Sequence, residues 1–258
     1  MGLKDLIVTL DPTERGFERL RVALQLARRD GADLTGCYVA ATTGHLEHAG
    51  GSAAEVAESM EGRFEEELAA TSVKGRWVLS GTPALDDLVL RSRVVDLVVA
   101  GLGDPADATA DPQGFGLDEL VLACGRPVLG LPIANVPGAI GRNVLIAWNG
   151  SREASRALHD ALPLLAHAEA VTLLVVDRDG IAEMAIDHLR RHEVKVAPDV
   201  VAHAGMEITD VILMEVERLG IDLLVAGAYG HSRVSEFLFG GVSRALLHQM
   251  AVPVLVSH

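Results

Sequence analysis

Cysteine, positive charge and long hydrophobic runs are scarce in this sequence, and each scarcity excludes a class of protein. The 258 residues include two cysteines, Cys37 and Cys124, which are too few and too far apart for a disulfide framework or a cysteine-based zinc site. We therefore expect two reduced, buried thiols. The 22 basic residues are outnumbered by 36 acidic ones, and the resulting net charge of −14 disfavours nucleic acid or an anionic membrane as a partner.

No stretch of the sequence is suited to crossing a membrane. The longest stretch without Asp, Glu, Lys or Arg lies between Arg126 and Arg142, is shorter than a membrane span and contains three prolines. The first residues lead directly into a short apolar strand, without the basic region and cleavage site of an export signal. These features predict a soluble protein located in the cytoplasm.

Length and composition predict two globular domains. Hydrophobic residues make up 49% of the chain and charged residues 22%, so there is enough apolar surface to form cores. A single core commonly serves about 100–150 residues. The Pro- and Gly-containing segment 131–141 lies close to the midpoint and has the composition of a connector. We expect domains at 1–136 and 137–258.

The two halves repeat the same order of predicted elements. The first opens with a strand at 5–10 and a helix from about 14 to 29, and the second with a strand at 143–148 and a helix from about 152 to 166. Uniformly apolar second strands follow at 33–39 and 170–176, as is typical of strands covered on both faces.

The best internal match lies late in each half. Asp96-Leu-Val-Val-Ala-Gly101 corresponds to Asp222-Leu-Leu-Val-Ala-Gly227, and the same 26-residue step then leads to Pro127 and to Pro253. This match indicates a duplicated domain. Alternating strands and helices predict an α/β fold, with two tandem Rossmann-like domains that each contain a doubly wound, parallel, five-stranded sheet. Ligands of such sheets bind beyond the carboxyl ends of the strands.

A glycine-rich loop follows the strand that ends at Ala226. Gly227 and Gly230 lie at the strand exit, and Gly240 and Gly241 precede an apolar helix predicted over 244–250. Glycines let the backbone approach a ligand closely, and the amides at a helix N-terminus suit phosphate oxygens. The pattern therefore fits a phosphate pocket, although glycines at such turns also serve turn geometry alone.

These residues resemble the universal stress protein family, and the doubled unit resembles its tandem two-domain members. The resemblance is strongest at 149–153 and from Asp222 to His258, with the spacing Gly227-x-x-Gly230, nine residues, Gly240. It implies that the glycines hold the phosphates of ATP or another adenine nucleotide, with Mg if the ligand is ATP, and that Asn149 and Val176 hold the nucleoside. The residues expected at this site are Asn149, Val176, Gly227, Gly230, His231, Arg233, Gly240, Gly241, Val242 and Ser243.

Two positions depart from the pattern of the ATP-binding relatives. Gly241 stands where they have Ser or Thr, and a hydrogen bond to a charged group is worth about 1.5–3 kcal/mol, so we expect binding to be weakened rather than abolished. Asn149 replaces an acidic residue but can still accept a hydrogen bond from a ribose hydroxyl.

The first half departs further from the nucleotide-binding pattern. Asp104 and Pro105 correspond to Gly230 and His231, which places a carboxylate near the phosphate position and removes an amide donor. Asp11 and Val39 keep the nucleoside-end residue types, and Gly101 and Gly114 are also kept. We predict that nucleotide binds the second half only.

Three functions remain open on the sequence. The first is a regulatory universal stress protein that binds adenine nucleotide, with at most slow hydrolysis because no catalytic residue can be named. The second is a scaffold that binds no nucleotide and acts through protein association. The third is a phosphohydrolase or transferase for a small phosphorylated substrate, which we disfavour for want of a catalytic constellation.

Histidine pairs and the last strands support further expectations. His188 and His192 are four residues apart on a predicted helix and could hold a metal, but no third ligand is evident and surface histidines are the simpler reading; the same holds for His45 and His48. The resemblance also implies that the last strands of the two domains, 127–130 and 253–256, pair within the chain as a pseudo-dimer, and the chain could form a homodimer as well.

Overall fold

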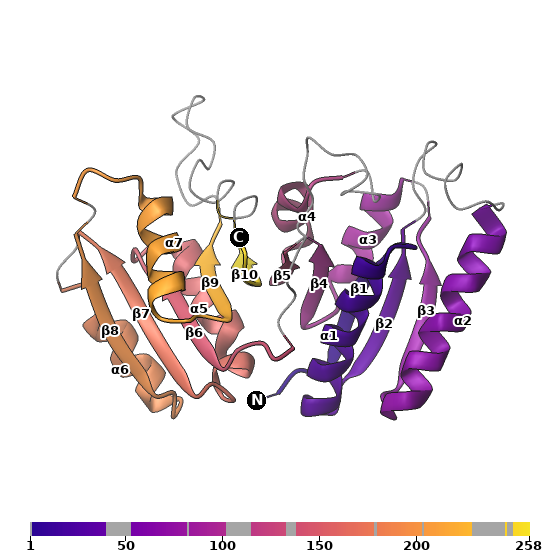
Figure 1. The fold of residues 1–258 in the computed structure, drawn as a ribbon, viewed down its shortest axis with the longest axis horizontal. Coiled ribbons are helices and arrows are strands. Elements are labelled where there is room, and N and C mark those ends of the chain that lie inside the picture. The colour runs from indigo at the N-terminus through magenta and orange to yellow at the C-terminus, as the bar shows by residue number, and fades with distance from the viewer. Residues whose placement is uncertain are drawn as a thin grey trace. The chain divides into compact units, whose positions relative to one another are not determined.

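The computed structural model describes residues 2–39, 53–81, 83–101, 115–132, 138–177, 180–202, 204–228, 246 and 250–258. The chain divides into two compact units, Gly2–Val136 and Pro137–His258. Each unit is an α/β domain built around a parallel sheet (Figure 1).

The first unit alternates strands and helices. In chain order its elements are β1 (Asp5–Leu10), α1 (Glu14–Asp30), β2 (Asp33–Tyr38), α2 (Ala53–Thr71), β3 (Gly75–Leu79), α3 (Ala84–Ser92), β4 (Leu97–Gly101), α4 (Leu117–Cys124) and β5 (Val128–Leu131). The strands pair in parallel in the order β3-β2-β1-β4-β5. Helices α1 and α2 cover one face of this sheet, and α3 and α4 cover the other (Figure 1).

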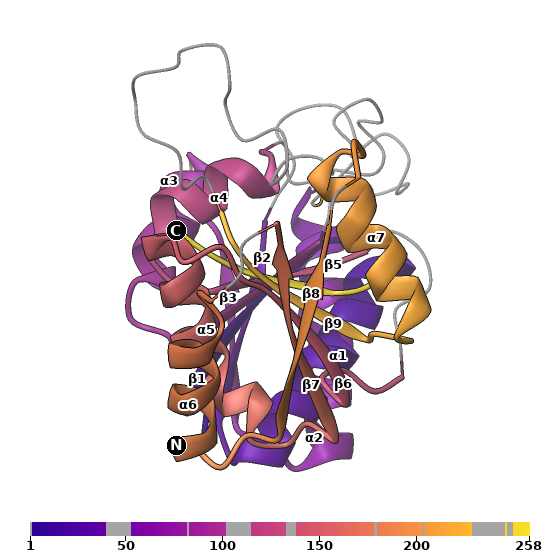
Figure 2. The same cartoon turned by 90° about the vertical axis from the view of Figure 1, so that its left-hand side faces the viewer.

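The second unit repeats this arrangement. Its elements are β6 (Asn143–Ala147), α5 (Arg152–Leu165), β7 (Ala170–Val176), α6 (Glu183–Arg191), β8 (Val196–Val201), α7 (Ile208–Arg218), β9 (Leu223–Gly227) and β10 (Val254–Ser257). The parallel strand order is β8-β7-β6-β9-β10. Figure 2 shows α5 and α6 on one face of this sheet and α7 on the other. The helix predicted over 244–250 lies mostly outside the described residues.

The predicted fold class, two doubly wound α/β domains, is confirmed. In each unit the strand order reverses at the first strand, so that β1 lies between β2 and β4, and β6 lies between β7 and β9. A reversal of this kind leaves a crevice at the carboxyl ends of the two central strands, where ligands of doubly wound sheets bind.

The repeated aspartates, Asp96 and Asp222, have the same structural role. Asp96 accepts hydrogen bonds from the amides of Lys4 at 2.7 Å and Asp5 at 3.1 Å, immediately before and at the start of β1. Asp222 accepts from the amides of Gly141 at 2.8 Å and Asn143 at 3.2 Å at the start of β6. Each carboxylate therefore ties the entry of the central strand to the start of its neighbour, β4 or β9.

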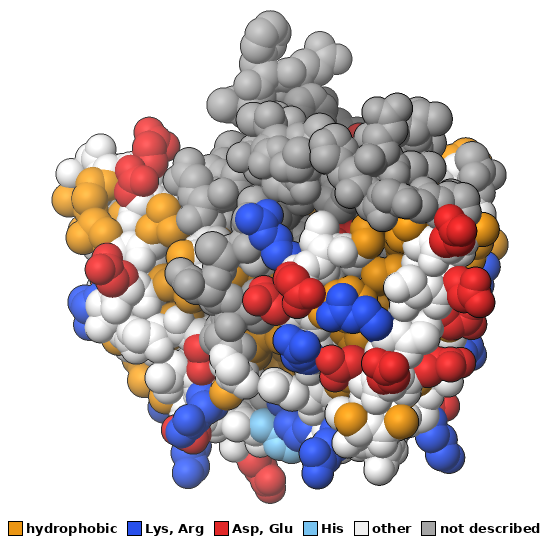
Figure 3. All heavy atoms as spheres, turned by 45° about the vertical axis from the view of Figure 1, so that its right-hand side comes forward, with side chains coloured by type: hydrophobic (Ala, Val, Ile, Leu, Met, Phe, Trp, Pro, Cys, Tyr) orange, Lys and Arg blue, Asp and Glu red, His pale blue; other side chains and the backbone are white. Residues whose placement is uncertain are grey.

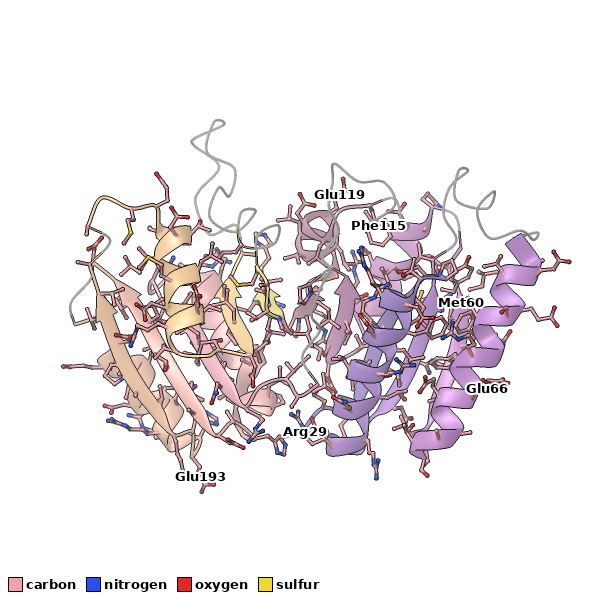
Figure 4. All side chains as sticks on the ribbon, viewed as in Figure 1. Arg29, Met60, Glu66, Phe115, Glu119 and Glu193 are labelled. Carbon is pink, nitrogen blue, oxygen red and sulfur yellow. The ribbon has the colours of Figure 1, made fainter. Side chains whose placement is uncertain are left out.

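The acidic segment 55–67 belongs to the amphipathic helix α2. Met60 and Phe64 are buried, whereas Glu66 is exposed. Figure 4 shows Met60 on the side of α2 that faces the sheet. Phe64 packs against Gly36 of β2, where a Cβ atom would lie only 2.5 Å from the ring.

Both cysteines are free and buried, as predicted. Burial is the main cause that raises the pKa of the Cys37 thiol to about 12. A thiol with this pKa is protonated at neutral pH and is a poor nucleophile.

Acidic and basic side chains are interspersed on the face of the molecule shown in Figure 3. Ion pairs join α1 to α2 at Arg21–Glu67, with an N–O distance of 3.3 Å, and at Arg63–Glu14, at 3.5 Å.

Among the described residues, no helix is both long enough and apolar enough to cross a membrane.

Candidate functional site

Three of the predicted nucleotide residues lie at one edge of the second sheet. Strand β6 pairs with both β7 and β9, and Ala147 near its carboxyl end is in register with Leu174 and Ala226. Asn149 follows β6, whereas Val176 and Gly227 are the last residues of β7 and β9. Adjacent parallel strands thus bring these positions together at the crevice.

A tight turn fixes the backbone around Asn149. The amide of Ser151 donates to the Asn149 Oδ1 at 2.9 Å, and the Ser151 hydroxyl accepts from the Ala154 amide at 3.1 Å as the N-cap of α5. Gly150 between them has a φ of +75°, a conformation that glycine adopts without strain. The Asn149 side chain remains exposed to solvent.

The first unit makes the same turn with different residues. The Thr13 amide donates to the Asp11 Oδ1 at 2.9 Å, and the Thr13 hydroxyl accepts from the Gly16 amide at 3.1 Å as the N-cap of α1. Asp11 is thus the structural counterpart of Asn149, and Thr13 of Ser151. Unlike Asn149, Asp11 is buried, with a relative exposure of 2%.

Arg19 of α1 pairs with the buried Asp11. Its guanidinium donates a charge-assisted hydrogen bond to the Asp11 carboxylate, and its Nε donates to the Thr9 carbonyl oxygen at 3.0 Å. A Cβ atom on Gly101, the last residue of β4, would lie 2.6 Å from the Arg19 Nη1. The arginine therefore spans the ends of β1 and β4 and occupies the crevice edge of the first unit.

The second unit has no such arginine at this position. Arg19 lies six residues after the N-cap Thr13, and the residue six after the N-cap Ser151 is Ala157, which is buried. A methyl side chain cannot reach across the strand ends. Among the described residues, the two units thus differ at this position: Arg19 covers Asp11 in the first unit, whereas Ala157 is too short to cover Asn149 in the second.

The glycines that close β4 and β9 serve different contacts. At Gly227 a Cβ atom would lie 2.3 Å from the Ala154 amide nitrogen and 2.4 Å from the Glu153 carbonyl carbon, both backbone atoms of α5. Gly227 therefore allows the N-terminus of α5 to approach β9 closely. At Gly101 the closest atom belongs to the side chain of Arg19.

Trp148 links the two loops that border Asn149. Its backbone amide donates to the Leu174 carbonyl at 2.9 Å, and its indole Nε1–H donates to the Ile181 carbonyl at 3.0 Å. The loop after β6 is thereby joined to the segment that leads into α6. Trp148 is partly exposed at the crevice edge.

The phosphate end of the predicted site is outside the described residues. This applies in the second unit to Gly230, His231, Arg233, Gly240, Gly241, Val242 and Ser243. In the first unit it applies to Asp104, Pro105 and Gly114. Their assignment stays a prediction.

His188 and His192 do not form an isolated pair. His159 of α5 contacts His188 with ring centroids 4.6 Å apart, and His188 contacts His192 with centroids 4.7 Å apart. No group of three or more His, Cys, Asp or Glu side chains in the described part of the chain is arranged to hold a metal ion. His45 and His48 lie outside that part.

The sequence analysis missed the roles of Arg19, Trp148 and His159. A usable signal existed for Arg19, because it interrupts the apolar face of a predicted helix that contains Phe17, Leu20 and Ala23. No sequence signal places Trp148 or His159, since their partners come from other elements of the fold.

Comparison with known proteins finds similarity to one family in part of the chain. The model of the universal stress protein family matches residues 178–258. No match was found among curated proteins.

Solved structures of universal stress proteins share the fold over both units. The universal stress protein of Archaeoglobus fulgidus superposes with a TM-score of 0.74 and 15% identity, covering 98% of this chain and 97% of that one. A putative universal stress protein of Pseudomonas aeruginosa gives a TM-score of 0.64 and 14% identity, with coverages of 99% and 93%. The resemblance is therefore confirmed in sequence for the C-terminal segment and in fold for the tandem pair.

A shorter relative has been solved with a nucleotide. The universal stress protein family protein of Arabidopsis thaliana, solved with AMP bound, is 21% identical and covers 43% of this chain and 87% of its own, with a TM-score of 0.33. This superposition is too weak to transfer its AMP site to the residues of this chain.

Proposed function

We propose that this universal-stress-type chain is a regulatory protein that binds one adenine nucleotide, and that the second unit alone provides the site. The proposal is supported by the resemblance of the glycine loop to nucleotide-binding family members and by the difference between the units at Asp11 and Asn149.

The carrying observation is the burial of Asp11 under Arg19. A ribose hydroxyl could reach the Asp11 carboxylate only by displacing a guanidinium that is 7% exposed and is also bonded to the Thr9 carbonyl. Removing one partner of a buried ion pair costs about 3–5 kcal/mol, which is comparable to the whole affinity of a millimolar ligand. The first unit therefore lacks a usable nucleoside end.

The second unit offers a nucleoside end of suitable chemistry. The carboxamide of Asn149 is exposed and can accept from, and donate to, ribose hydroxyls. Val176 is partly exposed at the end of the neighbouring strand and gives an apolar surface for the nucleoside. The phosphates would extend toward the loop that begins after Gly227, with Mg²⁺ accompanying ATP.

Calorimetric titration of ATP, ADP and AMP into the protein tests this site. We expect Asn149→Leu to weaken binding about tenfold, since the lost hydrogen bonds are worth about 1.4 kcal/mol. Asn143→Leu is the matched control because Asn143 lies at the opposite end of the same strand, where its side chain donates to the Gly220 carbonyl at 3.3 Å. Asn143→Leu should leave the affinity for nucleotide unchanged.

Two results would contradict the proposal. One is equal binding by the wild type and Asn149→Leu. The other is absence of binding, together with no thermal shift in excess nucleotide, since ligand at 100 times its Kd adds about 2.7 kcal/mol of stability. The second result would favour the scaffold that acts through protein association.

Cytoplasmic location and the pairing of the two last strands remain predictions.

A further inference from the structure

Three imidazoles from two helices form a stack in the second unit. His159 comes from α5, and His188 and His192 come from α6. The rings of His159 and His188 are tilted by 46°, and those of His188 and His192 by 60°. His188 is in the middle and supplies the contact between the helices.

The described hydrogen bonds of this stack leave one nitrogen of His188 without a partner. The His159 Nδ1 donates to the Ser155 carbonyl at 2.7 Å, because a carbonyl oxygen can only accept. The His188 Nε2 is buried and has no hydrogen-bond partner among the described residues. A proton placed on that nitrogen would be a buried, unpaired charge, which is costly.

The charged surroundings of His188 also oppose protonation. His159 on α5 and His192 and Arg191 on α6 all disfavour a positive charge on it, and burial, the largest cause, acts in the same direction. Together they lower the pKa of His188 below its ordinary value of 6.5.

The acidic groups nearby are held by other partners. Asp187 on α6 is paired with Arg190, with an N–O distance of 3.6 Å, and Asp160 on α5 accepts from the Ser257 hydroxyl at 2.8 Å. Asp199 of β8 is paired with Arg218 of α7, the helix on the opposite face of the sheet from α6.

We propose that the His159–His188–His192 stack is an acid-sensitive contact that holds α6 against α5 at neutral pH and releases it when the medium acidifies. At neutral pH His188 is neutral and stacks between the other two rings. In acid, protonation of His188 puts a positive charge on a ring whose Nε2 has no hydrogen-bond partner among the described residues. The separated state, in which His188 is solvated, takes up that proton readily and is therefore favoured.

Proton linkage gives the direction of the pH effect on the packing of α6 against α5. The packed state binds fewer protons at His188 than the separated state, so the packing is fully present above pH 6.5 and is lost as the pH falls from 6.5 through the lower pKa of the packed state. Because separation of α6 from α5 takes up one proton, the equilibrium constant for separation rises at most about tenfold for each pH unit that the pH falls within that window.

The position of the two helices connects this contact to the nucleoside end. Helix α5 starts at Arg152, three residues after Asn149, and α6 follows the segment that Trp148 holds through Ile181. Movement of α6 away from α5 would disturb both loops. This consequence for ligand binding rests on the proposed function, whereas the acid-sensitive contact does not.

Hydrogen exchange of the ligand-free protein at pH 7.5 and 5.5, corrected for the intrinsic pH dependence of exchange, tests the contact. We expect the amides of α6 to exchange at least severalfold faster at pH 5.5 in the wild type and to lose this acceleration in His188→Phe, which keeps an aromatic ring that cannot be charged. His167→Phe, an exposed histidine outside the stack, is the matched control and should behave as the wild type.

A direct titration keeps the test valid if a variant does not fold. NMR titration of the wild-type protein should show His188 titrating below pH 6.5. Titration of His188 at or above 6.5, or an unchanged acceleration of exchange in His188→Phe, would overturn the proposal. If the wild type loses nucleotide affinity at pH 5.5 and His188→Phe does not, the acid-sensitive contact also controls the ligand site. If no nucleotide binds at any pH, the proposed function is overturned, but the exchange result still tests the contact.

Discussion

Arg19 and Asp11 form an ion pair whose side chains are 7% and 2% exposed, at the position where the other unit presents an exposed Asn149. The pair closes the crevice edge of the first unit with its own charges. The proposed restriction of nucleotide to the second unit depends on this difference.

Removal of Arg19 should strongly destabilise the first unit. Arg19→Ala leaves the Asp11 carboxylate buried without its charged partner, which costs about 3–5 kcal/mol. Chemical denaturation measures this loss. Arg21→Ala, which removes an exposed pair with Glu67, is the control and should cost less than about 1 kcal/mol.

The double variant Asp11→Asn/Arg19→Ala copies the residues of the second unit, Asn149 and Ala157, into the first. Because no buried charge remains, most of the stability lost in Arg19→Ala should return. A double variant as unstable as Arg19→Ala would show that packing of the arginine side chain, rather than the buried charge, accounts for the loss.

The two strand-end glycines should respond unequally to alanine. At Gly227 the new Cβ would meet backbone atoms of α5 at 2.3 Å, which cannot move without displacing the helix. At Gly101 it would meet the end of the Arg19 side chain at 2.6 Å. We expect Gly227→Ala to cost about 2–3 kcal/mol, near the upper range for overpacking, and Gly101→Ala to cost less. Melting curves of both variants decide this, and a larger loss for Gly101→Ala would contradict the assignment of the contacts.

Much of the fold could be predicted from the sequence because it depends on local pattern. The strand at 5–10 and the helices that begin at 14 and 152 were placed from apolar periodicity and turn residues, and their bounds agree with β1, α1 and α5 to within a residue. The duplicated Asp96 and Asp222 segments predicted the two sheets.

The candidate site was predicted less completely because its distinctive contacts are tertiary. Asp11 has the residue type expected at the nucleoside end, and Arg19 stands out in the sequence as a charge on the apolar face of its helix, but the sequence does not show that the arginine pairs with Asp11. Similarly, His188 and His192 were visible as a helical pair, whereas His159 joins them only because α5 and α6 lie side by side in the folded unit.

The reactivity of the cysteines should follow their burial. Cys37, with its pKa raised to about 12, and the buried Cys124 should react slowly with a thiol reagent at pH 8 in the folded protein. Both should react within seconds in denaturant. Fast reaction of one thiol per chain under native conditions would show that one of the units opens readily.

Trp148 should report nucleotide binding by fluorescence. Trp77 packs in the first unit against Tyr38 and Phe64, with ring centroids 6.0 and 5.6 Å away, and should be insensitive to the ligand. In a Trp77→Phe background we expect nucleotide to change the emission of Trp148. In a Trp148→Phe background the change should disappear while binding persists in calorimetry.

Counting nucleotides per chain at saturation, by native mass spectrometry or equilibrium dialysis, tests the central claim most directly. The ion pair of Arg19 with Asp11 in the first unit and the exposed Asn149 in the second predict one nucleotide per chain and the same count for Asp11→Asn. Two equivalent nucleotides per chain would contradict it.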